Sequence, residues 1–123
     1  MHVLVVDDDA PIRRALARTV RGLGLHPVEA ATGPDALAVL SLNTRIVLVL
    51  LDVHIPHLDG IAVLEAIRST TGLDHVKVLM CTCADDLTSI LMALTAGASG
   101  YLVKPVAPND LRSRLGLLGI PPQ

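Results

Sequence analysis

Short runs of apolar residues alternate along the chain with segments in which apolar residues recur at helical spacing. The runs are rich in Val, Ile and Leu and end at acidic, glycine or proline positions, which is typical of buried strands. They predict strands at residues 3–6, 28–30, 46–52, 76–81 and 100–103. The segments between them predict helices at residues 11–23, 36–42, 60–70, 84–96 and from 108 to about 116.

Five strands that alternate with five helices predict an α/β fold built from parallel strand–helix–strand units. Right-handed crossovers place the five helices on both faces of a single sheet. Five strands suit the flavodoxin-like, doubly wound order 2-1-3-4-5, in which ligands bind beyond the carboxyl ends of strands 1 and 3. The chain of 123 residues fits one domain, which we place at residues 1–119, and residues 120–123 read as a tail or a linker stub.

Composition narrows the possible partners. Hydrophobic residues make up 51% of the chain, which excludes intrinsic disorder. A net charge of −2 and a single aromatic residue, Tyr101, provide neither the basic surface nor the stacking platforms of a nucleic-acid binder. The longest apolar run, residues 46–51, is too short to span a membrane, and the first residues do not resemble a signal peptide. We therefore expect a cytoplasmic protein that contacts neither nucleic acid nor membrane directly.

Two cysteines and two apolar residues of the fourth predicted helix can each be interpreted either as core residues or as functional ones. Cys81 and Cys83 are too few for a disulfide framework, and we interpret both as small buried side chains rather than as a redox or metal motif. Leu87 and Met92 belong to the apolar fourth helix, and we interpret them as core residues. The alternative for these two is a surface that binds a partner protein.

Polar residues follow the carboxyl ends of four predicted strands. Asp7 and Asp8 come after strand 1, Asp52 ends strand 3, and Thr82 and Lys104 follow strands 4 and 5. In the order 2-1-3-4-5 they converge on one crevice. Clustered carboxylates repel one another, and oxygen ligands with open positions favour Mg²⁺ together with a phosphate. A lysine ammonium and a threonine hydroxyl suit a phosphoryl group, and a carboxylate can be the nucleophile that accepts it.

Each of these residues also has a simpler interpretation. An Asp at a strand end often caps the following helix, and we expect this role for Asp9 and Asp59. For Asp7 and Asp8, each taken alone, capping and ligand binding are equally favoured. A hydroxyl such as that of Thr82 often bonds to the backbone. The joint placement at neighbouring strand ends is what favours a shared site.

Four segments carry a resemblance to a known family. They are LVVDDDAPIRR (residues 4–14), LVLLDVHIPHLDG (48–60), VLMCTCA (78–84) and GASGYLVKP (97–105). In this order and at this spacing they resemble the receiver domains of bacterial two-component response regulators, over residues 2–118. The last segment is similar to that of single-domain chemotaxis regulators.

The resemblance implies a role for each acidic residue of the site. Asp52 would accept a phosphoryl group from a sensor histidine kinase or a phosphotransfer protein. Asp8 would bind Mg²⁺ directly and Asp7 through water, while Asp52 and the backbone carbonyl of His54 would complete the metal shell. The side chain of His54 would border the phosphoryl group.

The resemblance also implies a switch. Thr82 and Lys104 would bind the phosphoryl oxygens, and Tyr101 would turn inward as Thr82 shifts toward the phosphate. The Lys104–Pro105 peptide bond would be cis. This switch would change the face formed by helix 4, strand 5 and helix 5, where an unidentified downstream protein or output domain reads it. Such a module catalyses only its own phosphorylation and dephosphorylation and is not otherwise an enzyme.

Two other functions stay open at this point. The Asp7-x-Asp9 pair and the acidic pair Asp85–Asp86 resemble motifs of haloacid-dehalogenase-like phosphatases, although that family places its lysine before the acidic pair and Lys104 follows it. The second alternative is a pseudo-receiver that binds its partner without phosphate. Retention of all five residues of the site argues against it.

Overall fold

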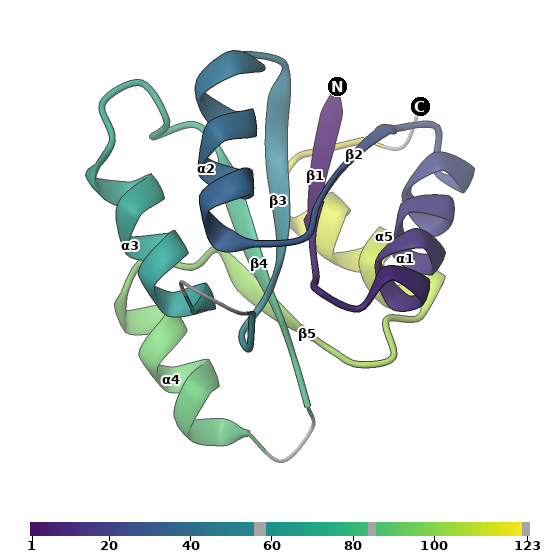
Figure 1. The fold of residues 1–123 in the computed structure, drawn as a ribbon. Coiled ribbons are helices and arrows are strands. Elements are labelled where there is room, and N and C mark those ends of the chain that lie inside the picture. The colour runs from purple at the N-terminus through teal and green to yellow at the C-terminus, as the bar shows by residue number, and fades with distance from the viewer. Residues whose placement is uncertain (56–58, 84–85, 122–123) are drawn as a thin grey trace.

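The computed structural model describes residues 1–55, 59–83 and 86–121. Strands and helices alternate along the whole chain (Figure 1). The elements are β1 (His2–Val6), α1 (Ala10–Gly22), β2 (His26–Ala30), α2 (Gly33–Leu42), β3 (Ile46–Asp52), α3 (Gly60–Ser69), β4 (Lys77–Thr82), α4 (Leu87–Thr95), β5 (Gly100–Val103) and α5 (Pro108–Leu117).

The five strands form one parallel sheet in the order β2-β1-β3-β4-β5. Helices α1 and α5 cover one face, and α2, α3 and α4 cover the other (Figure 1). This arrangement confirms the flavodoxin-like fold. Because all strands run in the same direction, their carboxyl ends lie along a single edge of the sheet.

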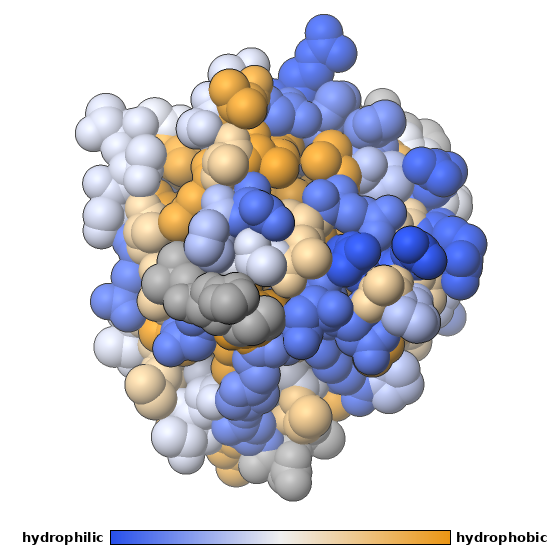
Figure 2. Space-filling view, in the orientation of Figure 1, coloured by the Kyte–Doolittle hydropathy of each residue, from blue (hydrophilic) through white to orange (hydrophobic). Residues whose placement is uncertain are grey.

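The central strand β3 supplies side chains to both faces of the sheet. Leu48 and Leu50 pack with α1 and α5, whereas Val49 and Leu51 pack with α2, α3 and α4. Strand residues alternate between faces, so a strand covered on both sides must be apolar at every position. The outer surface is different: on the face shown in Figure 2, hydrophilic residues predominate and hydrophobic ones form small patches between them. None of the helices in the described ranges is long and apolar enough to cross a membrane.

Side chains that cap helices fix where several elements begin. The carboxylates of Asp9, Asp59 and Asp86 and the hydroxyl of Thr32 each accept a backbone N–H in the first turn of α1, α3, α4 and α2 respectively. Such a cap satisfies an N–H that the helix itself leaves without a partner. The capping role predicted for Asp9 and Asp59 is therefore confirmed.

Most boundaries differ from the sequence prediction by one to three residues, and α2, for example, begins at Gly33 rather than at residue 36. Strand β2 begins at His26 and contains Pro27, which is compatible with its position at the edge of the sheet, where a residue without an N–H is tolerated. Helix α4 begins at Leu87, directly after its cap Asp86. Ile120 is buried in the cluster with α1 and α5, so the packed core extends one residue beyond the predicted domain end at residue 119.

The apolar helix α4 presents much of its side-chain surface to solvent. Ile90 and Ala93 are buried against the sheet, whereas Leu87 is 67% and Met92 54% exposed. The interpretation of Leu87 and Met92 as core residues was therefore wrong. A helix that is apolar on all sides has no pattern from which its buried face can be read.

Candidate functional site

Four of the side chains predicted for the site gather at the carboxyl edge of the sheet. Asp7 and Asp8 follow β1, Asp52 is the last residue of its neighbour β3, and Lys104 follows β5. Carboxylate oxygens of the three aspartates all lie within 4.8 Å of one another. The parallel topology is the cause, because it brings residues that are about fifty positions apart in the sequence to one edge of the sheet.

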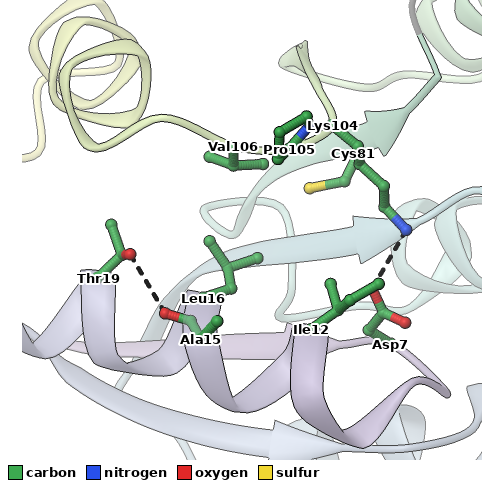
Figure 3. Close-up of a pocket in the computed structure, with 9 residues that line it drawn as sticks. All are labelled: Asp7, Ile12, Ala15, Leu16, Thr19, Cys81, Lys104, Pro105 and Val106. Carbon is green, nitrogen blue, oxygen red and sulfur yellow. Dashed lines mark hydrogen bonds and ion pairs between the residues drawn. The ribbon is translucent and has the colours of Figure 1, made fainter.

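Lys104 bridges two of the carboxylates. Its Nζ lies 3.1 Å from Asp52 Oδ2 and 3.2 Å from Asp7 Oδ2, and Figure 3 shows the contact with Asp7 as a dashed line. Asp7 and Asp52 are only 3% and 7% exposed. Buried carboxylates need a cation or hydrogen-bond donors close by, and the ammonium group meets this need for both.

The electrostatics of the site follow from burial and from these ion pairs. Burial raises the pKa of Asp52 above its usual value, and the hydrogen bond from His54 and the contact with Lys104 only partly oppose this. For Lys104, burial alone would lower the pKa, but the two neighbouring carboxylates outweigh it, and the pKa is raised. The ammonium of Lys104 therefore stays protonated at neutral pH beside Asp52.

Asp7 is held in place by a backbone N–H of its own loop and by the side chain of Arg13 on α1. Its Oδ1 accepts the N–H of Asp9 at 2.9 Å, and its carbonyl oxygen accepts a hydrogen bond from Arg13 at 2.9 Å. Helix α1 is capped by Asp9 instead. The capping alternative for Asp7 is therefore wrong, since this carboxylate faces Lys104 and the other acidic residues. Asp8 is exposed.

The donor set of the three aspartates fits Mg²⁺. Oxygen ligands on opposite sides of an octahedral Mg²⁺ ion are about 4.2 Å apart, close to the spread of the carboxylate oxygens of Asp7, Asp8 and Asp52. The exposure of Asp8 leaves one side of the cluster open to water, which Mg²⁺ usually retains in its shell.

Thr82 and Tyr101 lie on the two strands beside the acidic cluster. Thr82 ends β4 and is buried, and its hydroxyl donates a long hydrogen bond of 3.5 Å to the carbonyl oxygen of Cys83. Tyr101 lies on β5, is half-buried, and packs against the cluster that β4 forms with α2, α3 and α4. The guanidinium of Arg114 lies 5.4 Å from the centre of its ring.

The residue two positions after Asp52 makes two contacts that the sequence analysis missed. The backbone N–H of His54 donates to Asp52 Oδ1 at 3.1 Å. Its imidazole Nε2 lies 3.2 Å from Asp86 Oδ2, across the gap between the loops that follow β3 and β4. The sequence marks Asp86 only as half of an acidic pair, whose other member, Asp85, lies outside the described residues.

The Lys104–Pro105 peptide bond is cis, as predicted.

A cavity of about 410 Å³ adjoins the acidic cluster between α1 and the segment that follows β5. Its walls are mostly apolar, and Figure 3 shows the sulfur of Cys81 pointing into it.

Cys81 is buried as predicted, but Cys83 is exposed, so the interpretation of Cys83 as a buried side chain was wrong. Strand β4 ends at Thr82, and the alternation that would bury Cys83 beside Cys81 ends with it.

The two thiols are expected to react at very different rates. Burial raises the pKa of Cys81 to about 12, whereas Cys83 is in contact with solvent. Titration of the native protein with a chromogenic disulfide reagent should modify one thiol per chain rapidly and the second only after denaturant is added. Cys83→Ser should abolish the rapid phase, and Cys81→Ala should leave it intact. Two rapidly reacting thiols would contradict the burial of Cys81.

Comparison with known proteins places this arrangement in a family. Residues 3–116 match the model of the response regulator receiver domain. The response regulator MprA of a Mycobacterium species is 37% identical over 118 residues, which make up 96% of this chain and 50% of MprA. The chemotaxis protein CheY1 of Helicobacter pylori is 31% identical over 116 residues, 94% of each chain.

The fold comparison agrees with the sequence comparison. The structure of the Vibrio cholerae chemotaxis protein CheY4 superimposes with a TM-score of 0.87 at 30% identity, covering 95% of this chain and 97% of that one. The chain spans about half the length of several curated relatives, including a protein of Cyanophora paradoxa named "Probable transcriptional regulator ycf27". It matches chemotaxis regulators over nearly their full length. The fold, the strand-end residues and the family match agree, and the chain belongs to the receiver domains of two-component response regulators.

Proposed function

We propose that Asp52 is the phosphoacceptor of this receiver domain and that its phosphorylation is the signal the protein transmits. The orientation of the Asp52 carboxylate carries this proposal. Lys104 binds one of its oxygens, the N–H of His54 binds the other, and two further carboxylates lie beside it. A carboxylate held in this way can attack a phosphorus atom, because catalysis of phosphoryl transfer consists mainly of positioning and charge neutralisation.

The transfer needs few groups. A carboxylate oxygen of Asp52 forms the new bond to phosphorus while the bond from phosphorus to the donor breaks, and the donor group keeps that electron pair. With a phosphohistidine donor the leaving group is an imidazole. Lys104, already beside Asp52, neutralises part of the negative charge of the phosphoryl oxygens. The product is an aspartyl phosphate.

Asp7, Asp8, Asp52 and the backbone carbonyl of His54 are the groups that would hold Mg²⁺. When bound, Mg²⁺ would offset the charge of the carboxylates and of the incoming phosphoryl group. The donor set supports this assignment, because three carboxylate oxygens lie within 4.8 Å of one another.

Thr82 and Tyr101 are proposed to pass the signal to the face formed by α4, β5 and α5. The hydroxyl of Thr82 makes only a long bond to Cys83 and can exchange it for a phosphoryl oxygen. Tyr101 would turn inward as Thr82 shifts, since it pairs across the strands with Met80, two residues before Thr82 on the same strand. Exposed apolar residues of α4, Leu87 and Leu91 among them, would contact the downstream protein.

The partners follow from the family. The phosphodonor is proposed to be a sensor histidine kinase or a phosphotransfer protein, both acting in the cytoplasm. The reader is an output domain or a separate protein. Relatives of both kinds occur: MprA is about twice as long as the matched segment, and CheY1 is matched over 94% of its length.

The phosphatase alternative is less favourable. In haloacid-dehalogenase-like sites the second Asp of the Asp7-x-Asp9 pair must be free to act on the substrate. Here Asp9 caps α1 through its carboxylate, with Ile12 as the donor. Retention of all five site residues, Asp7, Asp8, Asp52, Thr82 and Lys104, argues against the pseudo-receiver alternative.

Acetyl phosphate tests the proposal directly. In the presence of MgCl₂ the protein is expected to gain one phosphoryl group in its intact mass, and fluorescence of Tyr101, the only aromatic residue besides histidine, should change at the same rate. Asp52→Ala should gain none, and chelation of Mg²⁺ should stop the reaction. A phosphoryl group on Asp52→Ala, or none on the wild-type protein with any small phosphodonor, contradicts the assignment.

A further inference from the structure

We propose that Asp86 is a positioning residue for the phosphoacceptor and that it acts through His54. The inference rests on the proposed function of Asp52. Two hydrogen bonds in series connect the residues. Asp86 Oδ2 lies 3.2 Å from the imidazole Nε2 of His54, and the backbone N–H of His54 donates to Asp52 Oδ1 at 3.1 Å.

Asp86 is the fixed end of this connection. It is the N-cap of α4, where its Oδ1 accepts the N–H of Ser89 at 3.3 Å. Its own N–H donates to the carbonyl oxygen of Cys83 at 3.2 Å. Hydrogen bonds at both the side chain and the backbone of Asp86 therefore restrict the movement of its carboxylate. The second oxygen of the same carboxylate is the one that reaches His54.

His54 is the movable part. Its side chain is 75% exposed, so the bond to Asp86, rather than packing, restricts the imidazole. The same residue supplies the N–H that orients Asp52 Oδ1, while Lys104 orients Oδ2. The carboxylate is thus held from two sides, and Asp86 stabilises the side that would otherwise depend on an exposed loop residue. A nucleophile held less firmly spends less time in the reactive orientation and reacts more slowly.

The size of the effect is limited by the exposure of the contact. Exposed ion pairs of this kind contribute little free energy. A reaction rate that depends on such a pair should therefore change by only about two- to five-fold when the pair is removed. Thr82 gives the contact a second consequence. Its hydroxyl and the N–H of Asp86 donate to the same acceptor, the carbonyl oxygen of Cys83. The first residues of α4 are therefore connected to Thr82 as well as to His54.

Two substitutions of Asp86 separate the contact with His54 from the helix cap. Asp86→Ser retains a side-chain oxygen that caps α4, but the shorter side chain does not reach the imidazole. Asp86→Asn retains both contacts, because its amide caps the helix with oxygen and offers its NH₂ group to an unprotonated Nε2. Asp59→Ser is the matched control, since it makes the same change at the cap of α3.

The measurement is the rate of Asp52 phosphorylation by acetyl phosphate with MgCl₂, followed by intact mass, together with the urea midpoint of each variant. Asp86→Ser and His54→Ala should each slow the reaction about two- to five-fold. The double variant should be no slower than either, whereas Asp86→Asn and Asp59→Ser should react at the wild-type rate.

Two results overturn the inference. Either Asp86→Ser and Asp86→Asn react at the same rate, or the losses in His54→Ala and Asp86→Ser multiply in the double variant. Failure of the proposed function has a different signature: Asp52→Ala would then gain a phosphoryl group as the wild-type protein does. Equal urea midpoints for Asp86→Ser and Asp86→Asn show that the difference in rate does not arise from loss of the cap.

Discussion

Replacement of Lys104 by alanine is expected to slow phosphorylation of Asp52 by on the order of 100-fold, the loss that follows removal of one preorganised charged or hydrogen-bonding group at a developing charge. Lys104 Nζ lies 3.1 Å from Asp52 and is held there by Asp7 at 3.2 Å, so it needs no rearrangement to meet a phosphoryl oxygen. The rate with acetyl phosphate at saturating MgCl₂ checks this expectation.

The same variant should be less stable without metal. Loss of the ammonium leaves two buried carboxylates, those of Asp7 and Asp52, without their shared cation. Leaving such groups unpaired costs on the order of 1–3 kcal/mol. Urea unfolding should show this loss in the presence of a chelator, and addition of MgCl₂ should restore more stability to the variant than to the wild-type protein.

Lys77 provides the matched control for Lys104. It is the other lysine of the chain and begins β4, at the opposite end of the strands from the acidic cluster. Lys77→Ala should therefore phosphorylate at the wild-type rate. If Lys104→Ala also reacted at that rate, the ammonium would have no part in the transfer.

Gly60→Ala is expected to destabilise the fold by about 1–3 kcal/mol, the usual cost of forcing an extra carbon into a packed region. Gly60 is the first residue of α3 and packs directly on the backbone that ends β3. A Cβ at this position would clash with the carbonyl oxygen of Asp52 and lie 2.8 Å from the Cα of Val53. Neither backbone atom can move without displacing Asp52 and the loop that follows it.

The comparison with Gly116→Ala makes this test specific. Gly116 lies in α5, and apart from its chain neighbours and the adjacent backbone of its own helix no described atom lies within 4 Å of the position of its Cβ. An alanine there should stabilise the protein by about 0.5–1 kcal/mol, because glycine is a poor helix former. Urea unfolding should thus shift in opposite directions for the two variants. Gly60→Ala should also slow phosphorylation, since Asp52 moves with its carbonyl group.

The sequence was sufficient to predict the sheet and the acidic cluster for one shared reason. Continuous apolar runs such as residues 46–52 identify buried parallel strands, and parallel strands bring their carboxyl ends to one edge. The proximity of Asp7, Asp52 and Lys104 follows from this topology alone. No detail of side-chain packing is needed for it.

Features that depend on loops or on the orientation of a helix could not be predicted. The contact between His54 and Asp86 joins residues 32 positions apart through two loops, and no periodicity relates them. Cys83 is exposed because β4 ends at Thr82. The predicted strand already ended at residue 81, so the error lay in extending the alternation of strand faces beyond the strand to Cys83. Leu87 and Met92 lie in a helix without charged residues, so hydrophobicity gives no indication of which side is buried.

The two outer strands also determine how copies of this protein can associate. Sheets grow when a further strand pairs with an exposed edge, which is a common route to aggregation. Here one edge is β2, interrupted by Pro27, and the other is β5, which is only four residues long. Neither edge offers a long, regular row of hydrogen-bonding groups to another chain. Pairing of sheet edges between copies is therefore disfavoured at both sides of this sheet.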